Sequence, residues 1–506
     1  MRKALLFAAL LLAAPSRAEN VKIEVFHTND IHGWIMARPA PFGEEKGKRL
    51  IGGAAALANA LKRYSEPDAH ALLFDAGDWF QGTPEGAFTR GQAMVEFFNA
   101  LRYDAVAVGN HDFDLGADHL RQLVSGLKMP VLGANVLSAA TGERVSFLKP
   151  YIIKEIAGIK VGVFALLTSN MPALVFPKNF QGLAAGNEIE WAKKTVAELK
   201  ERGADVVILL SHAGVSNESV SIPIDDKAIA AQVRGIDLIV GGHSHTALAL
   251  PLRDAANGTL IVQTGTGLTR VGRVVLEVDP KTRKVVKSEG RLHDLWVDEL
   301  GQDPGVLKMV ERIEKEVGGE MDVVVGTSAA AMGRERAKES QLGDWVTDCE
   351  RKYTKTQVAL QNSGGIRADM NAGPVTYREI FDIMPFDNKL VTMNLTGALL
   401  RDVLEISVAG GHGMLQVSGL SFSFDPSAPP GRRVREVSVA GKPLSEKDVY
   451  SVTTVDFMAL GGEGETPFAR GADKAFMPDA MRDVLEWCVQ QYSPLQAPAM
   501  GRIRRL

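Results

Sequence analysis

The chain has 506 residues, 45% of them hydrophobic, and a formal net charge of -4. A chain of this length and composition can bury large cores, and the length alone predicts roughly two to four domains. The charge is modest and mixed along the sequence, which argues against a basic face that follows a phosphate backbone. We therefore expect a globular protein with no nucleic-acid polymer as a partner.

Residues 1–18 have the pattern of a secretory signal peptide. Arg2 and Lys3 precede an apolar run over residues 4–14, and small residues around Ala18 form a cleavage site. A retained membrane anchor is the alternative, but the run is shorter than the roughly 20 residues that a spanning helix needs. We expect cleavage after Ala18, no stable membrane anchor, and a periplasmic or secreted mature protein.

Five apolar segments in the first half of the chain each end in a polar cluster. Such runs, bounded by turn residues, are typical of buried strands. They cover residues 21–26, 71–74, 105–108, 206–210 and 236–240. Helical patterns separate most of them, at residues 52–64, 91–99, 117–126 and 188–202. This alternation predicts βαβ units, in which ligands bind at the carboxyl ends of the strands.

Further strands are expected at residues 159–167, 259–263 and 270–278. Together with the first five they predict a domain built on two sheets, and the strand at 270–278 is expected to close it. This first domain is predicted to cover residues 19–302.

A helix over residues 303–319 is predicted to connect two domains. Asp303 suits the N-cap, Pro304 the first helical position, and Gly318 with Gly319 the end. The second domain, residues 320–506, is expected to begin with a strand at 323–325. Its other strands are predicted at 358–360, 390–394, 422–424, 434–439 and 450–454, and its helices at 340–353, 376–381, 396–408 and 479–491.

Two cysteines, Cys349 and Cys488, lie in helical sequence of this second domain. An oxidising compartment permits a disulfide between them. Two buried free thiols fit the sequence equally well, because a disulfide requires a specific geometry that spacing does not reveal. The sequence leaves their pairing open.

Polar clusters at the ends of the first-half strands combine carboxylate, imidazole and carboxamide groups. Five of the ten histidines lie in them. A single His at a strand end is more often a structural residue, but the whole set predicts two divalent metals about 3.5–4 Å apart. The clusters are Asp30-Ile31-His32, Gly77-Asp78, Gly109-Asn110-His111-Asp112-Phe113-Asp114, Ser211-His212 and Gly241-Gly242-His243-Ser244-His245.

The order of these motifs resembles the calcineurin-type metallophosphoesterases and, more narrowly, the secreted 5'-nucleotidase family. The second half is similar to the C-terminal domain of that family, so the resemblance covers nearly the whole mature chain. It implies an α/β fold with three parts. These are an N-terminal four-layer αββα sandwich, a linker helix and a C-terminal α+β domain that binds the substrate.

The resemblance also implies the metal ligands. One metal would be bound by Asp30, His32, Asp78 and His245, and the other by Asp78, Asn110, His212 and His243. Asp78 would bridge the two ions. Zn is the expected metal, with Mn or Co as alternatives. Some relatives have Gln at the position of His245, and that change should preserve the site but alter its metal preference.

Two further residues of the same clusters resemble the catalytic pair of the family. His111 would not bind a metal. It would stabilise the transferring phosphoryl oxygens or protonate the leaving group. Asp114 would orient the ring of His111.

The second half carries residues that resemble the substrate pocket of the family. Phe386 and Phe457 match two rings that sandwich a nucleobase, which contributes about 1–3 kcal/mol per base. Taken alone, each Phe is more often a core residue, but both lie in Gly- and Pro-rich loops, where pocket residues concentrate. The other implied contacts are Arg336, Asn362, Gly364, Arg367, Asn388 and Glu463, the last of which replaces an Asp found in many relatives.

These implications predict a hydrolase that releases phosphate from nucleoside 5'-monophosphates and also splits UDP-sugars or other nucleotide diphosphates. The enzymatic alternatives are a 2',3'-cyclic-nucleotide phosphodiesterase with 3'-nucleotidase activity and a sulfur-compound hydrolase. A secreted nucleotide-binding protein with an inactive metal site is the non-enzymatic alternative, although no expected ligand is missing. We expect a monomer or homodimer whose two domains rotate about the linker during turnover.

Overall fold

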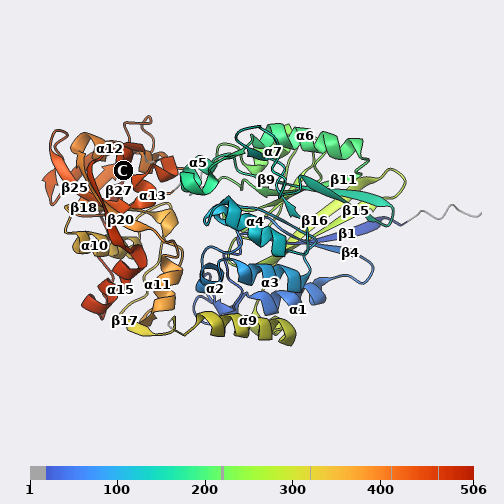
Figure 1. Ribbon diagram of the computed structural model, residues 1–506, viewed down its shortest axis with the longest axis horizontal. Helices are drawn as coiled ribbons and strands as arrows, with labels where there is room; N and C mark the ends of the chain where they lie inside the picture. Colours follow the sequence, from blue (N-terminus) through green and yellow to red (C-terminus); the bar gives the residue numbers. More distant parts are fainter. Residues whose placement is uncertain (1–18, 218–221, 320, 412, 465) are drawn as a thin grey trace, which may run out of the picture.

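The computed structural model describes residues 19–217, 222–319, 321–411, 413–464 and 466–506. The predicted signal peptide, residues 1–18, lies outside these ranges. Figure 1 shows two lobes side by side, an N-terminal lobe in blue to yellow-green and a C-terminal lobe in orange to red. Within the described ranges, no helix is both long enough and apolar enough to cross a membrane.

Two six-stranded sheets form the centre of the N-terminal lobe, and both contain parallel strands. The first has the order β16-β15-β1-β4-β5-β6. Its strands are β1 (Val21–Thr28), β4 (His70–Asp75), β5 (Ala105–Ala107), β6 (Val131–Leu132), β15 (Arg270–Asp279) and β16 (Lys284–Asp294). The second has the order β13-β14-β12-β11-β9-β8. Its strands are β8 (Tyr151–Ile156), β9 (Ile159–Leu167), β11 (Val206–His212), β12 (Leu238–Gly241), β13 (Leu252–Arg253) and β14 (Leu260–Val262).

The two sheets are the middle two of four layers. Successive side chains of each strand point to opposite faces, so each sheet packs against the other sheet on one face and against helices on the other face. Val25 and Phe74 of the first sheet share one buried cluster with Val163 and Ile208 of the second, so the sheets pack face to face. The outer face of the first sheet is covered by α1 (Ala54–Tyr64), α3 (Gln92–Leu101) and α4 (Ala117–Gly126). The outer face of the second is covered by α6 (Glu188–Glu201) and α7 (Asp226–Gln232). The predicted αββα arrangement is confirmed.

The domain does not end at the strand predicted over 270–278. That strand, β15, continues into β16, which pairs with it antiparallel and forms an edge of the sheet. β16 has charged residues along its length and is largely exposed or half-exposed, so it lacks the apolar run by which the other strands are recognised. The expectation that β15 closes the domain is therefore wrong.

The helix predicted as a connector is α9 (Pro304–Val317). The Asp303 side chain caps it by accepting hydrogen bonds from the backbone N–H groups of Gly305 at 2.9 Å and Val306 at 3.0 Å. Val310 and Ile313 are buried in the core of the N-terminal lobe, and α9 lies along α1 in Figure 1. The helix is therefore a packed part of this lobe.

The C-terminal lobe contains a five-stranded sheet of order β21-β18-β25-β20-β26 and a four-stranded sheet of order β24-β23-β22-β27. The strands of the first sheet are β18 (Val358–Asn362), β20 (Lys389–Thr396), β21 (Leu415–Ser418), β25 (Val449–Val455) and β26 (Ala472–Ala480). The second contains β22 (Leu420–Phe424), β23 (Val434–Val439), β24 (Lys442–Pro443) and β27 (Ile503–Arg505). The longer helices are α10 (Gln341–Thr354), α11 (Tyr377–Ile383), α12 (Gly397–Ala409) and α15 (Met481–Tyr492).

Shorter elements complete the fold. In the N-terminal lobe these are β2 (Arg38–Pro39), β3 (Leu50–Ile51), α2 (Pro84–Phe88), η1 (His111–Phe113), β7 (Val136–Ser138), α5 (Met171–Leu174), η2 (Pro177–Phe180), β10 (Leu183–Ala185) and α8 (Val297–Leu300). In the C-terminal lobe these are β17 (Val324–Ser328), η3 (Ser363–Gly365), β19 (Gly373–Thr376), α13 (Asp456–Ala459), η4 (Gly462–Gly464) and α14 (Thr466–Ala469).

The two cysteines, whose pairing the sequence left open, form a disulfide. Cys349 lies on α10 and Cys488 on α15, and the bond joins two segments that are 139 residues apart in the chain. Each residue is only 1% exposed. The disulfide therefore ties two helices together inside the core of the C-terminal lobe.

Candidate active site

The predicted metal ligands meet where the carboxyl ends of β1, β4, β5, β11 and β12 come together. Several of them lie on tight turns directly after these strands, with backbone conformations in the left-handed region. The φ values are 50° for Asp30, 53° for His32, 63° for Asp78, 68° for His243 and 56° for His245. Such conformations cost roughly 1–3 kcal/mol each and cluster at functional sites. The fold thus stores strain where the clusters converge.

Four of the predicted ligands form one compact group. One donor atom from each of Asp30, His32, Asp78 and His245 lies within 4.8 Å of all the others. The Nε2 atoms of His32 and His245 are 3.0 Å apart, and Nε2 of His245 is 3.4 Å from Oδ1 of Asp30. Two imidazole nitrogens that face each other beside two carboxylates are a suitable donor set for a first-row divalent metal.

A second group shares Asp78 with the first. Oδ2 of Asp78 is 3.2 Å from Nε2 of His212 and 3.7 Å from Nε2 of His32. Oδ1 of Asn110 is 3.2 Å from the same atom of His212 and 3.0 Å from Nδ1 of His243. Asp78 therefore lies between the two donor sets, as a bridging carboxylate must.

Backbone carbonyl groups orient two of the imidazoles. Nδ1 of His32 donates to the carbonyl of Gln81 and Nδ1 of His212 to the carbonyl of Ala76, each at 2.7 Å. Because a carbonyl can only accept, Nδ1 carries the proton and the lone pair of Nε2 points to the donor cluster. This tautomer is the one that binds a metal through Nε2.

Sequence reasoning missed the role of Asp112, which joins two of the loops. Its carboxylate accepts hydrogen bonds from the backbone N–H groups of Asp78 at 3.0 Å, Trp79 at 2.8 Å and Gly109 at 2.7 Å. It thereby fixes the turn of Asp78 against the turn of Asn110. Its position inside a polar cluster was visible in the sequence, but its partners were not.

Burial and neighbouring charges shift the pKa values of the cluster in opposite directions. Burial raises the pKa of Asp30 to about 7. Burial lowers the pKa of His212, but the Asp78 carboxylate raises it more, to about 10. Burial lowers the pKa of His243 to about 3. Desolvated carboxylates and imidazoles packed together favour a bound cation, which supplies the positive charge that protons would otherwise provide.

His111 and Asp114 form a hydrogen-bonded pair beside this cluster. Nδ1 of His111 is 2.8 Å from Oδ2 of Asp114, and the backbone N–H of His111 donates to Oδ1 of Asp78 at 2.9 Å. Burial lowers the pKa of His111, but the carboxylates of Asp114 and Asp78 raise it more, so the net shift is upward. The ring is therefore poised to hold a proton.

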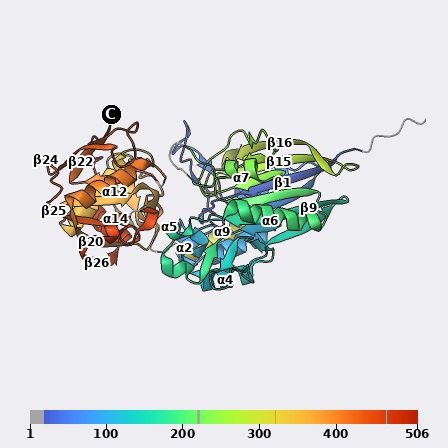
Figure 2. The same ribbon diagram turned by 90° about the horizontal axis from the view of Figure 1, so that it is seen from above.

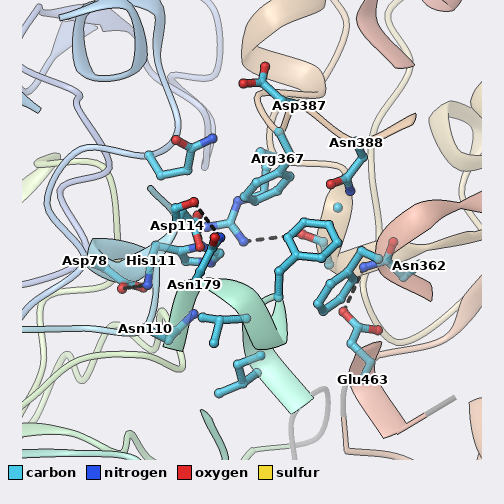
Figure 3. A pocket seen from close by; sticks show the side chains of 18 of the residues that line it. Asp78, Asn110, His111, Asp114, Asn179, Asn362, Arg367, Asp387, Asn388 and Glu463 are labelled. Atoms are coloured by element: carbon cyan, nitrogen blue, oxygen red, sulfur yellow. Dashed lines mark hydrogen bonds and ion pairs between the residues drawn. The ribbon is translucent and has the colours of Figure 1, made fainter. Parts of the chain in front are cut away.

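A cavity of about 720 Å³ lies between the two lobes and contains most of the predicted site. Figure 3 shows Asp78, Asn110 and His111 on one side of it and Arg367, Asn362, Asn388 and Glu463 on the other. All predicted substrate contacts line it: Arg336, Asn362, Gly364, Arg367, Phe386, Asn388, Phe457 and Glu463. The predicted ligands Asp30, His32 and His212 are almost fully buried.

Arginine side chains from the C-terminal lobe enter this cavity. Nη2 of Arg367 is 3.0 Å from Nε2 of His32 in the other lobe. Burial and the charges of Arg334 and Arg336 lower the pKa of Arg367 to about 10. Nε of Arg336 is buried and makes no hydrogen bond within the described part of the chain. Both guanidinium groups line the cavity, so an anion that binds at the cluster would lie beside two positive charges.

The two predicted base-binding rings lie in the C-terminal lobe, Phe386 on the loop before β20 and Phe457 in the short helix α13. The ring of Phe386 stacks on His111 with a centroid distance of 5.4 Å and an interplanar angle of 29°. Arg482, which sequence reasoning missed, positions Phe386 by donating to the backbone carbonyls of Pro385 at 3.0 Å and Phe386 at 2.9 Å. Phe457 opens α13. No sequence pattern connects Arg482 to this loop.

Glu463 has a different surrounding from that expected of a ribose contact. Its Oε1 accepts a hydrogen bond from Nδ2 of Asn362 at 2.8 Å, and burial raises its pKa. Glu463 therefore orients Asn362, which itself lines the cavity. A direct contact between Glu463 and a sugar stays a prediction.

The paired sheets and the strand-end cluster define the class of the N-terminal lobe. A family model described as calcineurin-like phosphoesterase matches residues 23–247, and one described as 5'-nucleotidase, C-terminal domain matches residues 318–470. The protein is a metal-dependent phosphoester hydrolase. The two matches together cover most of the chain, and they make it similar to the 5'-nucleotidases.

Individual relatives agree with this family. The chain is 29% identical over 510 residues to the snake venom 5'-nucleotidase of Crotalus adamanteus, covering 90% of this chain and 83% of the relative. The crystal structure of a 5'-nucleotidase precursor from Thermus thermophilus has a TM-score of 0.87 at 29% identity and covers 96% of this chain and 99% of its own. The sulfate thiohydrolase SoxB of Thermus thermophilus shares the fold, with a TM-score of 0.82 at 19% identity and coverage of 96% of both chains.

Proposed function

We propose that this hydrolase releases phosphate from nucleoside 5'-monophosphates at a centre of two divalent metals. The observation that carries the proposal is the shared cavity. Four residues of the strand-end cluster, Asp78, Asn110, His243 and His245, and the His111–Asp114 pair line one side, and two arginines and two phenylalanines line the other. A nucleotide combines the phosphate that suits the first group with the planar base that suits the second.

The donor atoms fit two divalent metals. Asp30, His32, Asp78 and His245 would hold one ion, and Asp78, Asn110, His212 and His243 the other. Zn is the proposed metal, because imidazole nitrogen suits it. Mn, which suits carboxylate and carbonyl oxygen, and Co are the alternatives. When bound, such ions neutralise the charge of the phosphate and lower the pKa of water.

The other residues of the cavity would act on the phosphate directly. Arg336 and Arg367 would bind its oxygens, since guanidinium groups match this geometry. His111, held by Asp114, would donate a proton or a hydrogen bond to the oxygen on which charge develops. This position beside the cluster explains why His111 is an acid or electrostatic stabiliser in the proposal and not a ligand.

Phe386 and Phe457 would hold the base, because stacking tolerates different bases. Nucleotide diphosphates and UDP-sugars present the same base and are proposed as further substrates. A 2',3'-cyclic nucleotide also presents a base, so the aromatic pair does not separate this alternative. It does disfavour a small sulfur anion, although SoxB shares the fold.

We also propose that the protein is exported to the periplasm or secreted. The Cys349–Cys488 disulfide supports an oxidising compartment, because such bonds are rare in a reducing cytosol. The signal pattern of residues 1–18 supports the same conclusion.

Hydrolysis rates of AMP, UDP-glucose and 2',3'-cyclic AMP, with the nucleotide and nucleoside products separated by chromatography, test the proposed function. Sulfite or sulfate release from a thiosulfate-type substrate is measured beside them. The assays should be run with Zn, Mn or Co added to metal-depleted protein. We expect AMP to be hydrolysed with the highest kcat/KM. Hydrolysis of the sulfur compound without activity on AMP would overturn the proposal, and a preference for the cyclic nucleotide would replace it with the phosphodiesterase alternative.

A further inference from the structure

The segment from Met171 to Phe180, which we call the α5–η2 segment, belongs to the N-terminal lobe but reaches the boundary between the lobes. Figure 1 shows α5 beside the C-terminal lobe, and Figure 2 shows it on the same boundary from above. Met171, Val175 and Phe180 are buried in the core of the N-terminal lobe. The segment is therefore anchored at its start, middle and end.

This segment is attached to the turn that carries His111. Nδ2 of Asn179 donates to the backbone carbonyl of Asp114 at 2.7 Å. The ring of Phe180 contacts the ring of Phe113 edge to face, with centroids 5.0 Å apart. Phe113 and Asp114 follow His111 closely in the chain. The position of the α5–η2 segment is thus fixed relative to His111.

The exposed side of the same segment faces the substrate cavity. Phe176 is half-buried and contacts the ring of Phe457 edge to face, with centroids 5.8 Å apart and an interplanar angle of 80°. Both rings line the cavity, and so does Leu174. α5 also lies against η4, the short helix that carries Glu463. The catalytic lobe therefore supplies part of the wall around the proposed base site.

We propose that Phe176 is a third aromatic residue of the base pocket and a specificity-determining residue that the catalytic lobe contributes. This inference rests on the proposed function, because it takes a planar aromatic base as the ligand. An edge-to-face contact contributes beyond simple burial, since the positive ring edge meets a negative ring face. Phe176 makes this contact with Phe457, and it can make a similar contact with a base that stacks on the Phe457 ring.

The lobe from which Phe176 comes gives the contact a second consequence. Phe176 meets Phe457 only while the lobes lie together, the arrangement in which Arg367 also reaches His32. A bound base that touches both rings therefore stabilises this arrangement. A phosphate ester without a base lacks this contribution.

Phe176→Ala, compared on AMP and ribose 5-phosphate, tests the inference. The two substrates share the sugar and the phosphate ester, and only AMP has a base. We expect kcat/KM for AMP to fall about 3- to 10-fold more than kcat/KM for ribose 5-phosphate, with the extra loss mainly in KM. The inhibition constant of adenosine, which has no phosphate, should rise by the same factor. Phe176→Tyr keeps the ring and should restore both values.

Phe88→Ala is the matched control. Phe88 of α2 also contacts a ring of the C-terminal lobe, Phe381, at a centroid distance of 5.4 Å, but it is 53% exposed and lies outside the substrate cavity. Its loss should leave the ratio of the two kcat/KM values unchanged. An unchanged ratio in Phe176→Ala, or the same shift in both variants, would overturn the inference alone. Wild-type protein that does not hydrolyse AMP would overturn the proposed function and the inference with it.

Discussion

The two halves of the active site are built in different ways. The strand-end cluster lies within one lobe on short turns, and hydrogen bonds from the same lobe hold its side chains, such as that from Asn29 to Asp30 at 2.6 Å. The substrate side lies on loops of the C-terminal lobe whose contacts cross the boundary, such as that from Gln81 to the carbonyl of Pro385 at 3.1 Å. The groups proposed for the chemistry are thus preorganised within one domain, whereas those proposed for recognition depend on contacts between the two domains.

The preorganised half should be the easier to destroy. Asp78→Ala removes the carboxylate shared by both donor groups, so we expect loss of metal content and a fall in activity of at least about 10⁴-fold. Elemental analysis and AMP hydrolysis measure the two effects. Asp118→Ala removes an exposed carboxylate of the same lobe and should change neither. Full metal content in Asp78→Ala would contradict the bridging role.

His111→Ala separates chemistry from metal binding within the same half. Its ring lies beside the cluster and pairs with Asp114, so kcat for AMP should fall about 10²–10⁴-fold while both metals stay bound. His119→Ala is the matched control. The ring of His119 is hydrogen-bonded to the carbonyl of Arg90 and lies outside the cavity, so this change should affect neither kcat nor metal content. A His111→Ala protein that has lost a metal would show that this residue is a ligand.

The substrate side should respond in affinity more than in chemistry. Phe457→Ala removes a ring worth about 1–3 kcal/mol of stacking, so kcat/KM for AMP should fall about 5- to 150-fold. The fall for ribose 5-phosphate, which has no base, should be much smaller. Equal losses on the two substrates would rule out a base clamp at Phe457.

The smallest effect is expected from restricting the movement of the two lobes. Lys46 and Asp369 form an ion pair across the boundary. Joining Lys46→Cys and Asp369→Cys with a bismaleimide should slow turnover severalfold, because substrate entry and product release need the lobes to separate. The native cysteines are buried in a disulfide and should not react. Each single-cysteine variant, treated alike, is the control, and unchanged turnover in the crosslinked protein would argue against rotation.

Local patterns were sufficient to predict most elements of the fold and the members of the strand-end cluster. Buried strands such as β11 have continuous apolar sequence, and α9 has its cap at Asp303. Edge strands such as β16 and β26 were missed, since an exposed strand needs no apolar run. A continuous apolar run therefore identifies a buried strand but not a strand that is largely exposed to solvent.

By itself, the sequence determined which residue types lie at the strand ends, because parallel strands place their carboxyl ends at one edge of a sheet. Only the tertiary structure decided which distant segments contact each other. It paired Cys349 with Cys488, placed Asp112 between two loops and brought Phe176 to Phe457. Such contacts depend on how whole layers and lobes pack, and neither spacing nor hydrophobic periodicity along the chain encodes that packing.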